Sequence, residues 1–262
     1  MEHAIETSGL RKVFGEVAAV NGLDLTVPSG ALFGFLGPNG AGKSTTIKML
    51  TGLLSKTSGR ASVLGYDIDR DPVEYKRRIG VVPEELVLFD RLTGEEYLTF
   101  VGRMYGLPKD IVRSRGAELL ELMELPRDRK KLIVDYSHGM KKKLAFSAAM
   151  IHEPRLLFLD EPFEGIDAIA SRMLKDLMQT LLDRGVTIFL TSHILEIVEK
   201  LCSEIAIIHQ GELVAQGSLD ELQRGVAVPS DRVAASTATL EQIFLGLVER
   251  DDETRATLSW LG

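Results

Sequence analysis

The chain has 262 residues, of which 45% are hydrophobic and 26% charged, enough for one large α/β domain or two small ones. Its net charge of −7 argues against a duplex-binding protein, whose footprint is basic, so we expect no nucleic-acid partner. The single cysteine, Cys202, excludes an internal disulfide framework and suits a reducing cytoplasm. No stretch approaches the ~20 apolar residues that cross a bilayer, and the start lacks a signal-peptide pattern.

Three short runs of apolar residues predict buried strands, at 31–36, 156–159 and 186–190. Each run is continuous rather than alternating, which is typical of strands covered on both faces of a parallel sheet. Helical patterns lie beside them. One follows the first run, with an apolar face that we assign to Ile47, Leu50, Leu53 and Leu54. Another, between Ile169 and Leu182, separates the last two strands, so the segments predict a wound α/β sheet.

Residues 88–152 have helical patterns and few strand-like runs, so we expect a helical subdomain inserted between two strands. The helices are predicted at 97–105, 111–123 and 139–150. Farther along, the spacing around Gln210-Gly211 predicts a hairpin. We therefore divide the chain into one domain at 1–225 and a short extension at 226–262, in which Thr239 begins a helix with a capping box.

Two basic runs, at 127–131 and 141–143, interrupt this acidic chain. Both are short and lie in predicted helical surroundings. We interpret them as solvated helix faces rather than as phosphate-binding groups.

A glycine-rich segment follows the first buried strand and opens a helix. It reads Gly37-Pro38-Asn39-Gly40-Ala41-Gly42-Lys43-Ser44, a full match to the G-x-x-x-x-G-K-[ST] pattern. Backbone N–H groups of such a loop form an anion cradle at the helix N-terminus. Lys43 would reach the β- and γ-phosphates, and the Ser44 hydroxyl would ligate Mg²⁺. We call residues 37–44 the phosphate loop.

Acidic residues follow the second buried strand, and a histidine follows the third. Asp160 stands where a carboxylate can face Mg²⁺, and Glu161 is placed to orient or deprotonate an attacking water. Acidic residues commonly follow strands, so these two alone would not indicate catalysis. Their presence together with the phosphate loop favours the catalytic interpretation. His193 should reach the same sheet edge, where it would hold the γ-phosphate and the water in line with Glu161.

The order of these motifs resembles the nucleotide-binding subunit of an ATP-binding-cassette (ABC) transporter, over roughly residues 5–223. Between the phosphate loop and Asp160 stands Tyr136-Ser137-His138-Gly139-Met140, similar to the family's LSGGQ signature. The resemblance implies a P-loop NTPase core with a mainly parallel sheet, an N-terminal antiparallel β region and an inserted helical subdomain. It also implies an ATPase with ATP and Mg²⁺ as cofactors.

The resemblance implies roles for further residues. Ser137 Oγ and the Gly139 N–H would bind the γ-phosphate of an ATP held by a second cassette. Phe14 would stack on adenine, although a lone aromatic near a terminus is usually core. The nucleotide-binding residues are Phe14, Gly37, Pro38, Asn39, Gly40, Ala41, Gly42, Lys43, Ser44, Thr45, Ser137, Gly139 and Asp167. The metal-binding residues are Ser44, Asp160 and Glu84.

Two positions depart from the family pattern. Glu84 stands where the family has a glutamine that reaches Mg²⁺ and the water, and the neighbouring Glu85 leaves the register open. A carboxylate can still ligate Mg²⁺, but it adds negative charge beside the γ-phosphate. His138 replaces the first glycine of the signature. It is harmless if it faces away from the phosphate, and it could offset the charge of Glu84 if it faces in.

The resemblance implies two partners: a second cassette, for which a homodimer is the simpler arrangement, and a membrane permease on a separate chain. We therefore expect a cytoplasmic protein, peripheral on the inner face of the membrane. The short tail favours an exporter over an importer. A soluble ABC ATPase acting on ribosomes or nucleic acid is the alternative. An unrelated P-loop GTPase or kinase ranks last, because no guanine-reading Asn-Lys-x-Asp motif occurs.

Overall fold

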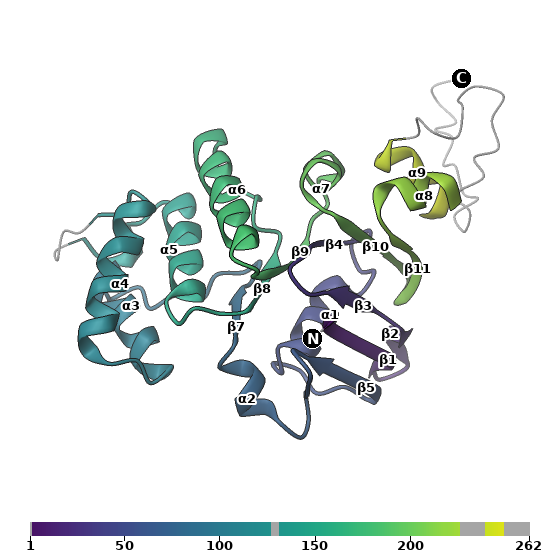
Figure 1. Ribbon diagram of the computed structural model, residues 1–262, viewed down its shortest axis with the longest axis horizontal. Coiled ribbons are helices and arrows are strands. Elements are labelled where there is room, and N and C mark those ends of the chain that lie inside the picture. Colours follow the sequence, from purple (N-terminus) through teal and green to yellow (C-terminus); the bar gives the residue numbers. More distant parts are fainter. Residues whose placement is uncertain (1, 127–130, 226–238, 249–262) are drawn as a thin grey trace.

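A computed structural model describes residues 2–126, 131–225 and 239–248 (Figure 1). Its larger sheet has six strands in the order β11-β10-β4-β9-β8-β7. The five strands from β10 to β7 run parallel, and β11 pairs antiparallel with β10. The bounds are β4 (Leu32–Leu36), β7 (Ile79–Val82), β8 (Leu156–Asp160), β9 (Thr187–Thr191), β10 (Glu204–His209) and β11 (Glu212–Gly217).

The three continuous apolar runs are the central strands β4, β8 and β9, as predicted. Every residue of all three strands is buried. Phe33, Phe158 and Phe189 come from the three strands, and the ring of Phe189 contacts the other two at 5.6 Å. Helices cover both faces of the sheet, which explains why these strands do not alternate apolar with polar residues. The predicted hairpin is confirmed as β10 and β11, which extend the sheet at its edge.

A second, antiparallel sheet is built largely from the N-terminal part of the chain. Its order is β2-β1-β5-β6, with β3 also paired to β1. The bounds are β1 (His3–Phe14), β2 (Val17–Leu23), β3 (Thr26–Pro28), β5 (Ser58–Val63) and β6 (Tyr66–Asp67). Its apolar face packs in the same core as β4 and the first helix, so the antiparallel region joins the central sheet through a shared core.

The helix after the phosphate loop is shorter than predicted. Helix α1 (Lys43–Leu50) ends where Gly52 adopts a positive φ of 69°. The N–H of Gly52 donates to Met49 O and that of Leu53 to Lys48 O, the Schellman arrangement that closes a helix. Leu53 is consequently 71% exposed, and its assignment to the buried helix face was wrong.

Three further helices belong to the core region: α2 (Pro72–Lys76), α6 (Ala168–Asp183) and α7 (Leu195–Leu201). Helix α6 lies between β8 and β9, as predicted, with Leu174 and Met178 in the core. Ile169, at its first turn, is 75% exposed and does not share that buried face.

The helices expected between β7 and β8 are α3 (Gly94–Met104), α4 (Lys109–Leu122) and α5 (His138–Met150), with a 3₁₀ turn η1 (Ile133–Asp135) before α5. They lie at the opposite end of the molecule from α8 (Leu219–Gly225) and α9 (Leu240–Val248) (Figure 1). The capping box predicted at Thr239 is present, since its N–H and Oγ1 both pair with Gln242. The basic run at 127–131 and the extension at 226–262 fall largely outside the described residues.

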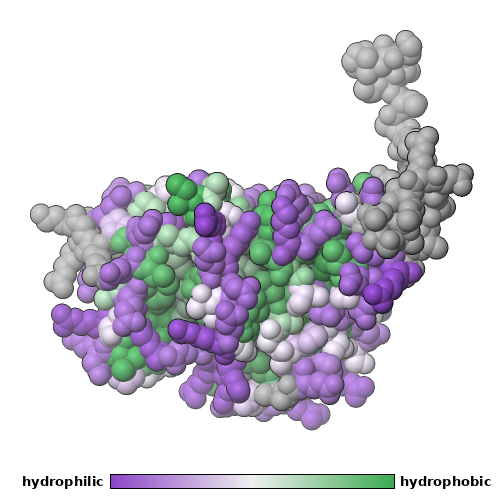
Figure 2. Space-filling model, turned by 45° about the horizontal axis from the view of Figure 1, so that its top comes forward, coloured by the Kyte–Doolittle hydropathy of each residue, from purple (hydrophilic) through white to green (hydrophobic). Residues whose placement is uncertain are grey.

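On the face drawn in Figure 2, hydrophilic residues are interspersed with hydrophobic patches. Within the described parts of the chain, no helix combines the length and apolar character needed to cross a bilayer.

Candidate functional site

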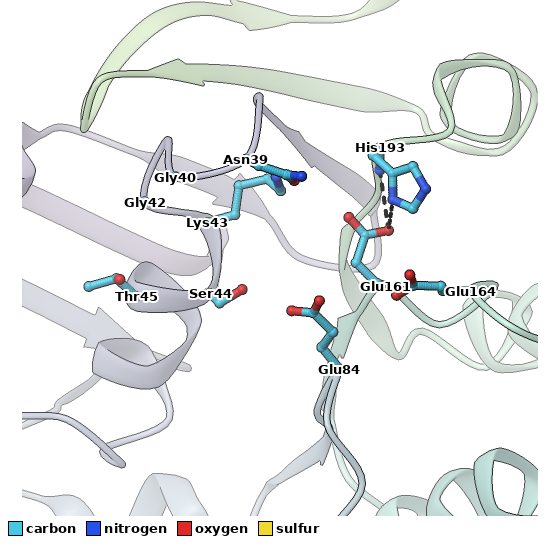
Figure 3. Close-up of a pocket in the computed structure, with 10 residues that line it drawn as sticks. All are labelled: Asn39, Gly40, Gly42, Lys43, Ser44, Thr45, Glu84, Glu161, Glu164 and His193. Carbon is cyan, nitrogen blue, oxygen red and sulfur yellow. Dashed lines mark hydrogen bonds and ion pairs between the residues drawn. The ribbon is translucent and has the colours of Figure 1, made fainter. Parts of the chain in front are cut away.

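A pocket of about 480 Å³ lies at the carboxyl edge of the six-stranded sheet (Figure 3). Its lining residues are Asn39, Gly40, Gly42, Lys43, Ser44, Thr45, Glu84, Glu161, Glu164 and His193. The phosphate loop forms one side of it, and the carboxylates with His193 form the other (Figure 3). Groups predicted separately from four sequence segments therefore share one cavity.

The strand order explains this convergence. Strands β4, β9, β8 and β7 are consecutive neighbours and all parallel, so their carboxyl ends meet at one edge. The segments that follow them carry the phosphate loop, His193, Glu161 and Glu84 respectively. Ligands bind at such an edge in open α/β sheets.

The phosphate loop has a backbone shape that requires glycine. Gly42 adopts a φ of 107° at the N-cap of α1, and a Cβ there would lie 2.4 Å from the carbonyl oxygen of Ala19. The buried ammonium of Lys43 donates to the carbonyl oxygens of Gly37 and Pro38 at 2.7 and 3.2 Å. The loop therefore places one cation and the N-terminus of a helix against the pocket, which suits an anion.

Glu161 is held by hydrogen bonds at both its backbone and its carboxylate. Its N–H donates to Thr191 Oγ1 at 3.1 Å, and the same hydroxyl donates to Asp160 Oδ1 at 2.6 Å. Its carboxylate accepts from the N–H of His193 at 3.2 Å and lies 2.9 Å from that ring's Nδ1. Glu161 has a positive φ of 48°, a strained conformation for a residue with a side chain. The carboxylate and imidazole predicted to act together are in direct contact.

The sequence did not indicate a role for Thr191 or Glu164. Thr191 is fully buried and bridges Asp160, the last residue of β8, and Glu161, the residue directly after it. Glu164 lines the pocket from the loop before α6. Thr191 ends a buried strand, as Asp160 does, and this shared position is a sequence signal that could have identified it. The position of Glu164 depends on the course of a loop, which the sequence does not indicate.

The structure decides which carboxylate after β7 belongs to the site. Glu84 lines the pocket and Glu85 does not. The carboxylate of Glu84 points across the cavity toward Ser44 (Figure 3). Asp160 is buried behind this lining, with its Oδ1 bound by Thr191.

The donor set fits a hard cation. Ser44 and Glu84 offer oxygen atoms within the pocket, and Mg²⁺ takes one or two carboxylates together with substrate phosphates rather than a full protein cage. The described residues contain no cluster of three or more His, Cys, Asp or Glu that could hold a metal ion.

The residues of the signature do not line this pocket. Ser137 caps α5 by accepting from the N–H of Met140 at 3.2 Å, and both Ser137 and His138 are exposed. The His138 ring lies against Gly165, because a Cβ at Gly165 would come within 2.9 Å of it. In its own chain, His138 therefore contacts the loop before α6. The exposed start of α5 is free to meet a ligand outside the chain.

Asp167 and Phe14 also stand outside the pocket. Asp167 Oδ1 accepts from the N–H of Ala170 at 2.8 Å and so caps α6. Phe14 ends β1 and is 50% exposed, with the Lys12 ammonium 5.0 Å from its ring centre. Phe14 is thus half-exposed rather than a core residue.

The interpretation of residues 141–143 as a solvated face was wrong for Lys142. This lysine is only 1% exposed, and its Nζ donates to the carbonyl oxygen of Glu161 at 2.7 Å. Lys141 and Lys143 do pair near the surface, with Asp90 and Glu124. The periodicity of α5 explains the difference, since a helix rotates neighbouring residues by about 100°.

Comparisons with known proteins identify the family of the chain. The pattern of the family described as ABC transporter matches residues 20–164, more than half of the chain. The daunorubicin/doxorubicin resistance ATP-binding protein DrrA of Streptomyces peucetius is 43% identical, over 97% of this chain and 79% of its own. The linearmycin resistance ATP-binding protein LnrL of Bacillus subtilis is 41% identical, over 83% and 70%.

A solved structure of the same family has a similar fold. The ATP-binding subunit of an ABC transporter has a TM-score of 0.85 and 32% identity, covering 93% of this chain and 99% of that one. This chain belongs to the ABC transporter family and is an ATP-binding, ATP-hydrolysing subunit of that family.

Proposed function

We propose that this subunit powers export of a drug-like or antibiotic compound through a membrane protein on a separate chain. The observation that carries the proposal is the division of the site. The phosphate loop, Glu161 and His193 share one pocket, while Ser137 and Gly139 face outward elsewhere on the same chain. Two chains that face each other would each complete the other's site.

Within one chain, the contacts support specific roles. Lys43 and the N–H groups of the phosphate loop hold the β- and γ-phosphates of ATP. Ser44, Asp160 and Glu84 would hold Mg²⁺, whose charge would offset that of the phosphates during transfer. Glu161 accepts the proton of the attacking water, and the His193 contact fixes the direction of its carboxylate. Phe14 stacks on the adenine.

Between chains, the signature closes the site. The N-terminus of α5 carries a partial positive charge, and Ser137 and Gly139 stand at its first turn. Ser137 and Gly139 bind the γ-phosphate of the ATP that a second copy holds. The ATP therefore contacts both cassettes and keeps them together. Hydrolysis and phosphate release then separate them. Because one chain contains both half-sites, a homodimer suffices. Asp167 would contact the partner cassette near the same interface.

The names of similar proteins support both the direction of transport and the class of compound transported. DrrA and LnrL are both named for resistance to an antibiotic. Resistance by export removes a compound from the cell, so we propose export of a compound of that kind. The membrane subunit would contain the cargo path, and this chain would stand at its cytoplasmic face.

An exposed apolar cluster supports a membrane subunit as partner. It consists of Phe89, Phe100 and Met104, on α3 and the loop before it. The rings of Phe89 and Phe100 meet edge to face at 5.2 Å, and Met104 follows Phe100 by one helical turn. Exposed clusters of this kind mark sites of protein association. We propose that a cytoplasmic segment of the membrane subunit covers the cluster.

Replacing Phe100 by aspartate is expected to reduce capture of this chain by its membrane partner about tenfold or more, because a charge would be buried in the contact. ATP turnover by the isolated chain should remain unchanged. The measurement is the amount of integral membrane protein that co-purifies with the tagged chain from detergent-solubilised membranes.

The matched control is Val73→Asp, which changes another exposed apolar residue, on α2. If Phe100→Asp co-purifies as much membrane protein as the wild type does, the cluster is not part of the contact with the membrane subunit. Recovery of ribosomes instead of a membrane protein would contradict the transport function itself.

Replacing Glu84 by glutamine is expected to raise the Mg²⁺ concentration for half-maximal turnover about three- to tenfold. An amide oxygen binds Mg²⁺ more weakly than a carboxylate, and a difference of about 1 kcal/mol has this size. The measurement is ATP turnover over a Mg²⁺ series. Glu85→Gln is the control, because Glu85 lies outside the pocket lining. Superimposable Mg²⁺ profiles for Glu84→Gln and the wild type would exclude Glu84 as a ligand.

A further inference from the structure

Lys142 is a buried lysine in the middle of α5, the helix that begins at the signature. Lysine is almost never fully buried unless its charge is paired or hydrogen-bonded. Here the side chain is 1% exposed, and its Nζ donates to the carbonyl oxygen of Glu161 at 2.7 Å. The two residues are 19 positions apart, with Lys142 in α5 and Glu161 directly after β8. The contact therefore joins the signature helix to the end of β8.

The carbonyl that Lys142 binds belongs to a strained residue. Glu161 has a φ of 48°, a left-handed conformation that a residue with a side chain keeps only where its surroundings enforce it. Hydrogen bonds to the backbone N–H and to the backbone C=O of Glu161 hold it in this conformation. Thr191 Oγ1 accepts the Glu161 N–H, and Lys142 Nζ donates to the Glu161 C=O. Together they fix the turn from which the carboxylate reaches His193.

Several acidic residues of the site also surround the ammonium group. Burial lowers the pKa of Lys142, while the charges of Glu164, Glu161, Glu84 and Asp160 oppose that shift. Glu164, Glu161 and Glu84 line the pocket. The lysine thus lies behind the acidic wall of the pocket rather than inside it.

We propose that Lys142 is a positioning residue for ATP hydrolysis, which holds the backbone of Glu161 in the conformation that directs its carboxylate into the pocket. Lys142 does not line the nucleotide pocket. It acts through Glu161, and the inference therefore rests on the proposed role of Glu161 as the base. Because Lys142 belongs to α5, the same hydrogen bond links the helix that meets the partner's ATP to the chain's own catalytic carboxylate.

The test is a comparison of kcat and KM for ATP hydrolysis in Lys142→Met, which keeps the apolar stem and removes the donor. We expect kcat to fall about 10- to 100-fold, the size of effect that a small misplacement of a reacting group produces. KM for ATP should stay within about twofold, because the lysine does not line the pocket. Lys142→Arg, which keeps a charged donor, should recover most of kcat.

The matched control is Lys141→Met, on the same helix, whose Nζ pairs instead with Asp90 at 3.3 Å. It should keep wild-type kcat. If thermal melting shows that Lys142→Met is unfolded, Lys142→Gln takes its place. Its shorter side chain is polar but does not span the distance that the lysine covers. Wild-type kcat in either folded variant would overturn the proposal, and so would a failure of Lys142→Arg to recover more activity than Lys142→Met.

Glu161→Gln in the same assay separates this inference from the function on which it rests. If Glu161→Gln retains turnover, the proposed base is wrong whatever Lys142 does. If Glu161→Gln is inactive and Lys142→Met has wild-type kcat, the positioning role alone fails. We expect no further loss when Lys142→Met is added to Glu161→Gln, because both changes remove the same step.

Discussion

Replacing Glu161 by glutamine is expected to reduce kcat for ATP hydrolysis about 10²- to 10⁴-fold while ATP binding persists. Glutamine has the same length and can still accept the hydrogen bond from the His193 N–H, and the backbone bonds of Glu161 to Thr191 and Lys142 are untouched. The amide cannot accept a proton from water at neutral pH. The variant should therefore bind ATP with a normal geometry and fail only in the chemical step.

A trapped dimer is the second expected property of Glu161→Gln. If ATP holds two cassettes together and hydrolysis separates them, a variant that binds without hydrolysing should elute as a dimer with ATP and Mg²⁺ and as a monomer with ADP. Size-exclusion chromatography measures this directly, with Glu164→Gln as the control for loss of a carboxylate that lines the pocket without touching His193. Turnover at the wild-type rate by Glu161→Gln would remove Glu161 as the base.

Replacing Gly139 by aspartate is expected to reduce ATP hydrolysis about 100-fold or more without lowering stability. A Cβ at Gly139 meets no atom within 4 Å, so the chain's own fold can accept a side chain there. An acidic residue in the first turn of a helix is favourable, and replacing glycine in a helix is favourable as well. The loss would arise between chains, where a carboxylate would face the γ-phosphate of the partner's ATP.

Gly139→Ala separates charge from size. It adds a methyl group at the same position and should retain most of the turnover of the wild type. Thermal melting of both variants should match or slightly exceed that of the wild type. If Gly139→Asp hydrolyses ATP normally, or if Gly139→Ala loses as much activity as Gly139→Asp, repulsion of a partner's phosphate is not the cause.

The elements that position the pocket were predictable because their signals are local. Continuous apolar runs identified β4, β8 and β9, since strands buried on both faces do not alternate. The residues directly after those strands then had to meet at one edge, which brought the phosphate loop, Glu161 and His193 together before any contact was known. Where local signals failed, as at Leu53, the cause was a glycine C-cap that ended the helix early.

The parts that could not be predicted depend on contacts between distant segments. The burial of Lys142 follows from how α5 packs against the end of β8, and three successive lysines give no sign of which one turns inward. Thr191 acquires its role only because β9 is the neighbour of β8. Glu164 reaches the pocket through the course of a loop. Each of these requires the tertiary arrangement rather than a pattern in one segment.

The division of the active site between two chains is tested most directly by mixing two inactive variants. Lys43→Ala removes the phosphate-binding cation but leaves the signature intact, whereas Gly139→Asp blocks the signature but leaves the phosphate loop intact. In a mixed dimer, the phosphate loop of the Gly139→Asp chain faces the signature of the Lys43→Ala chain, and one of the two sites is whole. We predict that ATP turnover, negligible for each variant alone, returns when they are mixed. A mixture that stays as inactive as its components, although size-exclusion chromatography shows mixed dimers, would contradict the composite site.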